Sequence, residues 1–143
     1  MADESCIFCS IINGDIPSAK VFENEHVYAF LDISQVTKGH TLIIPKNHEK
    51  DVFELREETA AELFKAVPAV ASALNDTFQP EGLNVLNNNK EPAGQSVFHY
   101  HLHLIPRYGS EDGFKAVWEE HSSDYSTETL QQMAQNIADA MNG

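Results

Sequence analysis

The feature that most constrains the fold is an alternating run, His99-Tyr100-His101-Leu102-His103. Because side chains alternate between the two faces of a β-strand, the run predicts a strand with three histidines on one face. We expect this strand to span residues 97–106, with Phe98 and the residues between the histidines packed under a helix. At ~3.3 Å per residue the outer two histidines lie about 13 Å apart, too far for all three to bind one metal ion easily.

The same run suits nucleophilic chemistry at phosphorus. A neutral imidazole can attack without first losing a proton, and a second histidine two residues away can hold or protonate a phosphate oxygen. Gly94-Gln95-Ser96 precedes the run and offers close backbone approach, N–H donors and a hydroxyl to an anion. The alternative for the histidines is a structural strand or a metal-binding pair.

The rest of the chain predicts one α+β domain. A length of 143 residues suits a single domain over residues 1–143, with a core at about 6–107 and a tail over 109–143. Hydrophobic periodicity and turn residues predict strands at 19–23, 26–31, 39–44 and 83–86, and helices at 6–13, 56–78 and 126–141. Pro68 predicts a kink or a break in the long helix. We therefore expect a five-stranded antiparallel sheet with one main helix plus short N-terminal and C-terminal helices.

Charge narrows the range of partners. The chain has 9 Lys+Arg against 22 Asp+Glu, a formal net charge of -13, which disfavours nucleic acid and anionic membrane surfaces as partners. A small phosphorylated ligand needs only a local group of donors. The sequence shows no apolar run long enough to span a membrane and no signal peptide, so we expect a cytoplasmic location. We expect a solvated acidic face before and at the start of the main helix, made by Glu49, Asp51, Glu54, Glu57 and Glu58.

Cys6 and Cys9 are the only cysteines, and their spacing is typical of a metal site or a redox pair. The βαβ context of a thioredoxin-like redox motif is absent. A tetrahedral zinc would need two histidine ligands, and the candidates are His26, His40, His48, His99, His101, His103 and His121. The alternative is a pair of small buried thiols.

Residues Gly94 to Arg107 resemble the signature of the histidine-triad (HIT) superfamily, His-φ-His-φ-His-φ-φ with φ apolar, and Tyr100 occupies one φ position. Three earlier segments resemble family segments in the same order: Cys6-Ile7-Phe8-Cys9, Phe30-Leu31-Asp32-Ile33 and Gly39 to Lys46. The resemblance therefore covers most of the chain, from Cys6 to Arg107.

The resemblance implies a HIT-like fold and a hydrolase or transferase that acts on the α-phosphate of nucleotide conjugates. The substrate would be a nucleoside phosphoramidate or a dinucleoside polyphosphate, and a nucleoside monophosphate would be released without a catalytic metal. His101 would form a covalent nucleotidyl-histidine, His103 and Ser96 would assist at the phosphate and leaving group, and His40 would support the triad. The residues implied to bind a purine nucleotide are Phe30, Leu31, Asp32, Ile33, Asn88, Gly94, Gln95, Ser96, His101 and His103.

The resemblance also implies a structural zinc held by Cys6, Cys9, His48 and His99, and a homodimer that meets through the main helix and strand 83–86. Two other functions remain open from the sequence. One is a nucleotide-binding regulatory protein with little turnover. The other is a metallohydrolase that uses His99 and His101 as metal ligands.

Overall fold

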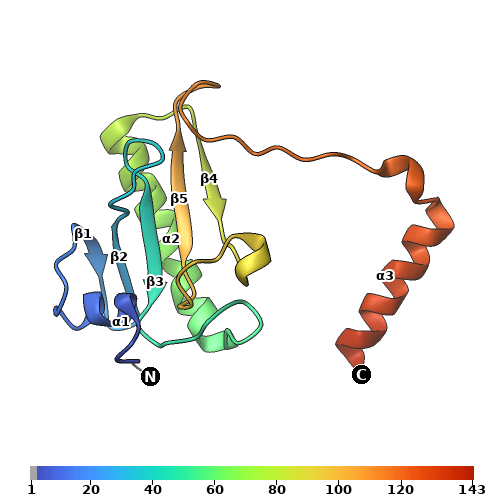
Figure 1. Ribbon diagram of the computed structural model, residues 1–143, viewed down its shortest axis with the longest axis horizontal. Coiled ribbons are helices and arrows are strands. Elements are labelled where there is room, and N and C mark those ends of the chain that lie inside the picture. The colour runs from blue at the N-terminus through green and yellow to red at the C-terminus, as the bar shows by residue number, and fades with distance from the viewer. Residues whose placement is uncertain (1–2) are drawn as a thin grey trace.

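The computed structural model describes residues 3–143 and confirms the α+β architecture (Figure 1). Its strands are β1 (Lys20–Glu23), β2 (Val27–Leu31), β3 (Thr41–Pro45), β4 (Gly82–Leu86) and β5 (Leu102–Arg107). They form one antiparallel sheet in the order β1-β2-β3-β5-β4, so β1 and β4 are its edges. The helices are α1 (Ile7–Ile12), α2 (Glu57–Phe78) and α3 (Thr127–Asn142), with short 3-10 turns at Glu91–Ala93 and Ser122–Asp124.

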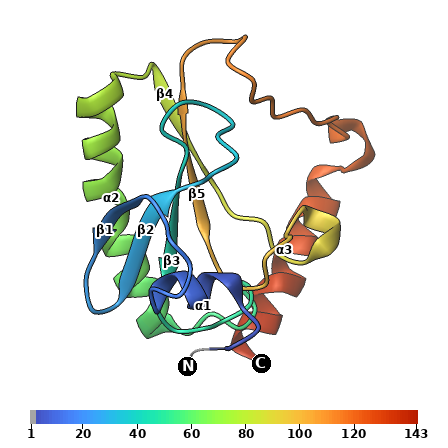
Figure 2. The same cartoon turned by 60° about the vertical axis from the view of Figure 1, so that its left-hand side comes forward.

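Each face of the sheet carries its own hydrophobic cluster. The face under α2 is lined by alternate strand residues such as Ala29, Ile43 and Leu104, all fully buried. The opposite face, where α1 lies, carries Phe30, Leu42 and their neighbours (Figures 1 and 2). The period-two pattern of the strands therefore assigns one face to the main helix and leaves the other for α1 and the histidines.

The long helix is continuous through Pro68, so of the two expected outcomes, a kink or a break, the break is wrong. Proline removes the N–H that would bond the carbonyl of Phe64, four residues earlier. Both residues are exposed, so water can hydrate that carbonyl. Leu63, Ala66 and Val70 continue the buried stripe on either side of the proline, and their packing holds the helix together.

The histidine strand is shorter than expected, because β5 begins at Leu102 and not at residue 97. The register of β3 with β5 places Tyr100 opposite Pro45, which has no N–H to donate, so the ladder cannot continue there. The Tyr100 N–H instead donates to the Glu49 carbonyl at 2.7 Å. Tyr100 still packs on the α2 side, but Phe98 is 46% exposed, so the expectation that it packs under the helix is wrong.

The acidic group at the start of α2 is not uniformly solvated. Glu49 and Asp51 are buried, contrary to expectation. The Glu49 carboxylate accepts hydrogen bonds from the Arg56 N–H at 2.6 Å and the Thr59 hydroxyl at 2.8 Å. The first bond satisfies one of the free N–H groups at the start of α2, where Arg56 provides no side-chain cap of its own, and the second fastens Thr59 of the first turn.

The C-terminal helix is confirmed, and the Ser126 side chain accepts from the Thr129 N–H as an N-cap should. Before it, Arg107 at the end of β5 donates to the Asp112 carboxylate at 2.9 Å and 3.1 Å. Beyond this ion pair, residues 115–143, here called the C-terminal arm, run away from the sheet (Figure 1). No residue of α3 is buried. Among residues 3–143, no helix combines the length and apolar character needed to cross a membrane.

Candidate functional site

A cavity of about 410 Å³ lies on the face of the sheet opposite α2. It brings together residues from the end of β2, from the loop before β5 and from the histidine run. The expected nucleotide-binding residues that line it are Phe30, Leu31, Asp32, Ile33, Asn88, Gly94, Ser96, His101 and His103. Residues separated by more than sixty positions therefore share one cavity, and its size suits a small-molecule ligand.

One wall of the cavity is apolar and comes from a part of the chain that sequence reasoning did not assign to the site. Phe8 and Ile11 of α1 and Ile16 beyond it line the cavity with Phe30. Phe8 packs edge-on against the rings of Phe30 and His101, at 5.6 Å and 5.1 Å between centroids. The apolar residues of the CxxC segment were the available signal, because a short helix must bury one side against something.

His101 has a defined neutral form. Its Nδ1 lies 2.7 Å from the carbonyl oxygen of His99, and since a carbonyl only accepts, Nδ1 carries the proton. The lone pair of a neutral ring is then on Nε2. Burial lowers the pKa of His101, which keeps the ring neutral at physiological pH. His101 therefore offers an unprotonated nitrogen to a ligand in the cavity.

In His103 the ring proton is on the other nitrogen from that of His101, and a chain of hydrogen bonds fixes this. The Val36 N–H donates to Nδ1 of His40 at 3.3 Å, so the proton of a neutral His40 is on Nε2. That nitrogen lies 2.9 Å from Nδ1 of His103 and 3.7 Å from an oxygen of Asp32. Nδ1 of His103 therefore accepts, and the remaining proton of its ring is on Nε2. Burial, with smaller contributions from His101 and His40, lowers the pKa of His103 to about 4.

The loop before β5 is fastened by Gln95, which is buried and does not line the cavity. Its side-chain amide donates to the Lys50 carbonyl at 2.7 Å and the Val97 carbonyl at 3.1 Å, and its oxygen accepts from the Lys90 N–H at 2.6 Å. All these partners are backbone groups, so the amide holds the loop in shape. Ser96 next to it lines the cavity.

Asn88 and Gly94 approach each other closely in the same loop. Gly94 has a φ of +100°, a conformation that side chains disfavour. A Cβ built on it would lie 3.6 Å from Cγ of Asn88, in ordinary contact. The glycine is therefore needed for its backbone angle more than for space.

A second cluster lies beside the cavity, where Cys6, Cys9, His48 and His99 each offer one ligand atom, all within 4.8 Å of one another. Nδ1 of His99 lies 3.4 Å from Sγ of Cys6 and 3.2 Å from Nδ1 of His48, and Sγ of Cys9 lies 3.4 Å from Nδ1 of His48. Nε2 of the buried His99 bonds the Pro45 carbonyl at 2.8 Å, so its Nδ1 is the nitrogen left unprotonated. The four residues could therefore bind a metal ion.

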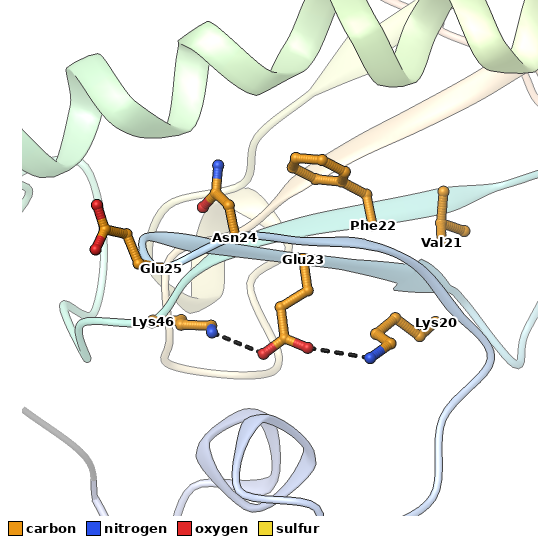
Figure 3. Close-up of a pocket in the computed structure, with 7 residues that line it drawn as sticks. All are labelled: Lys20, Val21, Phe22, Glu23, Asn24, Glu25 and Lys46. Carbon is orange, nitrogen blue, oxygen red and sulfur yellow. Dashed lines mark hydrogen bonds and ion pairs between the residues drawn. The ribbon is translucent and has the colours of Figure 1, made fainter.

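Another hollow, of about 550 Å³, lies against the β1–β2 hairpin. Figure 3 shows the Glu23 carboxylate between Lys20 and Lys46, at 3.1 Å and 2.7 Å from their nitrogens. The two lysines are thus neutralised within the protein, and no histidine or cysteine lines the hollow. This hollow therefore lacks the nucleophilic and proton-donating side chains that line the histidine cavity.

Comparison with known proteins gives consistent matches. The family described as "HIT domain" matches residues 13–110. "Protein hit" of Bacillus subtilis is 64% identical over 135 residues, 94% of this chain and 93% of that protein. The protein named adenosine 5'-monophosphoramidase hnt1 of Schizosaccharomyces pombe is 40% identical over 134 residues, 94% of this chain and 96% of that protein.

Solved structures match over nearly the whole chain. A HIT family protein from Bacillus anthracis superposes with a TM-score of 0.93 at 58% identity, covering 96% of this chain and 97% of that one. A member of the HIT family from Bacillus subtilis gives 0.92 at 64% identity, covering 95% and 96%. A structure described as a Zn-bound histidine triad family protein from Mycobacterium smegmatis gives 0.73 at 33% identity, covering 95% and 97%.

Proposed function

The chain belongs to the HIT family, and on that premise we propose that it hydrolyses a purine nucleoside 5′-phosphoramidate, releasing the nucleoside monophosphate. The observation that carries the proposal is the pairing of two neutral histidines in one cavity. His101 presents a bare nitrogen, and His103 presents an N–H. The names of the fungal relatives, adenosine 5'-monophosphoramidases, support a phosphoramidate over a dinucleoside polyphosphate as substrate.

In the first step, Nε2 of His101 attacks the α-phosphorus, and the bond from phosphorus to the leaving nitrogen breaks. The leaving amine takes up a proton from solvent, relayed by the Ser96 hydroxyl, and the nucleotidyl group stays on His101. Water then attacks the phosphorus and breaks the Nε2–P bond, and its proton is released. The Nε2–H of His103 donates to a phosphate oxygen throughout, and the Ser96 hydroxyl assists at the leaving group.

The rest of the cavity would hold the nucleoside. Asp32 lies at its rim, and one of its carboxylate oxygens accepts from the Ser34 N–H at 2.8 Å. Its other oxygen faces His40 at 3.7 Å and can accept from ribose hydroxyls. Phe30 and Leu31 supply apolar surface for the base, and Ile33, which is 98% exposed, would cover it from the rim. Asn88 would lie by the ribose and phosphate.

We propose zinc as the ion for the Cys6-Cys9-His48-His99 cluster. A tetrahedral Zn²⁺ places sulfur and nitrogen ligands about 3.6 Å apart and two nitrogens about 3.4 Å apart, close to the distances found here. Backbone N–H groups of Asp3 and Cys9 point at the two sulfurs at 3.3 Å and 3.4 Å, as suits thiolates. The zinc-bound relative from Mycobacterium smegmatis supports this choice. Bound zinc would fasten α1 to the sheet and take no part in the reaction.

We further propose that two copies pair along β4, the sheet edge next to β5. Val85 of β4 is 48% exposed, and so is Phe64 of α2. An unpaired strand edge with apolar neighbours favours addition of a second strand. The cytoplasmic location expected from the sequence stays a prediction.

The test is turnover of adenosine 5′-phosphoramidate without added metal, with intact-mass analysis at early times. We expect AMP release and a transient adenylyl adduct. His101→Ala should remove both, a loss of at least about 10⁴-fold, with nucleotide binding kept. His26→Ala, which changes an exposed histidine on the hairpin, is the matched control. Tight nucleotide binding with no turnover would replace this proposal with that of a regulatory nucleotide-binding protein.

A further inference from the structure

The C-terminal arm is the one long part of the described chain that its own body does not support. All its residues from Glu119 to Gly143 except Ala138 are exposed. The hydrogen bonds made by the side chains of α3 stay within the helix and its cap. A helix of 16 residues with no packing is only marginally stable in water. Something other than this chain's own body is needed to hold it.

The arm nevertheless carries a continuous apolar stripe. The spacing of i, i+3, i+4, i+7, i+8 and i+11 puts one side of α3 together, made by Leu130, Met133, Ala134, Ile137, Ala138 and Met141. The opposite side is polar, with Gln132, Gln135 and Asp139. Val117 and Trp118 before the helix are 86% and 74% exposed. Such a stripe with nothing against it is typical of a helix that packs on another molecule.

The position of the arm recurs in other proteins. Residues 109–143 make up about a quarter of the chain, so an alignment that left them out could not cover 96% of it. TM-scores of 0.93 and 0.92 with the two Bacillus proteins require most of the arm to superpose together with the body. An arm that its own body leaves exposed therefore has a counterpart of similar course in two crystal structures. Lattice packing differs from crystal to crystal, whereas a symmetric dimer carries the same arrangement into each.

The direction of the arm agrees with this reading. The chain leaves β5, passes the Arg107–Asp112 pair and runs out beyond the β4 edge of the sheet (Figure 1). In the second view α3 again stands apart from β1 and β2, on the far side of the molecule from the hairpin (Figure 2). This is the edge where we place the second copy, and the inference rests on that pairing. A symmetric pair lets each arm reach the other body.

We propose that the C-terminal arm docks on a second copy of this chain, and that the apolar stripe of α3 is covered by that copy. The arm then adds a second, helical contact to a dimer whose strands meet at β4. Exchange of arms buries the stripe, which α3 leaves exposed within its own chain, and it fixes α3 without any contact to its own sheet.

The experiment uses the full chain. A photo-reactive benzoylphenylalanine at position 130 is introduced into tagged protein, which is mixed with untagged protein and irradiated. We expect tagged-to-untagged products, and slow amide hydrogen exchange over residues 127–142 at dimer concentrations. Ile137→Glu should remove that protection and raise the dimer dissociation constant about tenfold or more. Gln132→Glu, on the polar side of the same helix, is the matched control and should change neither.

The outcomes separate the claims. Sedimentation as a monomer at high concentration would overturn the β4 pairing and the arm together. A dimer whose α3 amides exchange as fast as an unstructured chain, or crosslinks only within one chain, would overturn the arm alone. None of these readouts depends on turnover, so failure of the proposed reaction would be recognised separately.

Discussion

The two ends of the histidine run use the same side chain for opposite purposes. At one end His99 is fully buried, its Nε2 bonded to the Pro45 carbonyl and its Nδ1 turned to two cysteine sulfurs and His48. At the other end His103 lines the cavity, and its Nδ1 is bonded to His40. The first end has the donors of a structural metal site and the second has a proton to offer. What a histidine does is therefore decided by the partner of its second nitrogen.

The largest expected effect is on turnover, when His103 at the cavity end is replaced. His103→Ala removes the N–H offered to the phosphate, and we expect turnover to fall about 10²-fold or more, the usual range for such a group. The melting temperature should change little, because the side chain is only partly buried and lines a cavity. Thermal melting and steady-state kinetics on one preparation check both statements. A variant that keeps full activity would show that His103 is not the donor.

The opposite pattern is expected at the His99 end. Removal of bound metal with a strong chelator, or Cys9→Ala, should cost several kcal/mol of folding free energy, since metal binding is coupled to folding. This corresponds to a melting temperature lower by about 10 °C. The kcat of the protein that stays folded should remain within a few fold of its starting value. Rapid loss of kcat with an unchanged melting curve would reverse the roles of the two ends and favour a catalytic metal.

A smaller effect is expected between the ends, at the loop that Gln95 holds. Gln95→Ala removes three hydrogen bonds to backbone groups and loosens the segment that carries Ser96. We expect kcat/KM to fall about tenfold, by the same factor for phosphoramidates with different leaving amines. The family resemblance implied instead that Gln95 binds the nucleotide. If it touched the leaving group there, the factor would vary with the amine. A series of amines of different size distinguishes the two.

The smallest effect is the pH dependence of stability. The pKa of His103 is lowered to about 4 from an ordinary value of 6.5, through burial and its neighbours His101 and His40, against the opposing charge of Asp32. Between pH 6.5 and about 4, His103 is protonated in the unfolded chain but not in the folded one. The free energy of unfolding that is present above pH 6.5 is therefore lost as the pH falls. Denaturant unfolding between pH 7 and 5.5 should show this loss. His103→Gln should reduce the slope, and an unchanged slope would contradict the assignment.

Much of the site could be predicted because its signals are local. The alternation of histidines, the CxxC spacing and the segment at Asp32 each lie within a few residues, and the structure brings them to one cavity or to the metal-type cluster next to it. The features that were wrong depend on distant partners. β5 starts late because Pro45, far back in the chain, faces Tyr100. Glu49 is buried because its carboxylate accepts a hydrogen bond from the backbone N–H of Arg56 at the start of α2.

Two further features could not be predicted from neighbouring residues, because they too depend on partners distant in the sequence. The orientation of Gln95 is decided by the carbonyl of Lys50, a backbone group that any residue would supply. The contribution of Phe8 to the cavity depends on where α1 settles on the sheet. The helices and strands themselves were predicted within a few residues, apart from the start of β5. This succeeded because hydrophobic periodicity and helix caps depend on residues that are close in the sequence.

The alternation of histidines with Tyr100, Leu102 and Leu104 also limits how descendants of this chain can vary. Each apolar neighbour belongs to the core under α2, so functional and structural positions are interleaved along one segment. Exchanges of one apolar residue for another keep the pattern and are open to drift. Insertion or deletion of a single residue would turn every following histidine into the core and every core residue into the cavity. Apolar substitutions in this segment are therefore tolerated, whereas insertions and deletions are not.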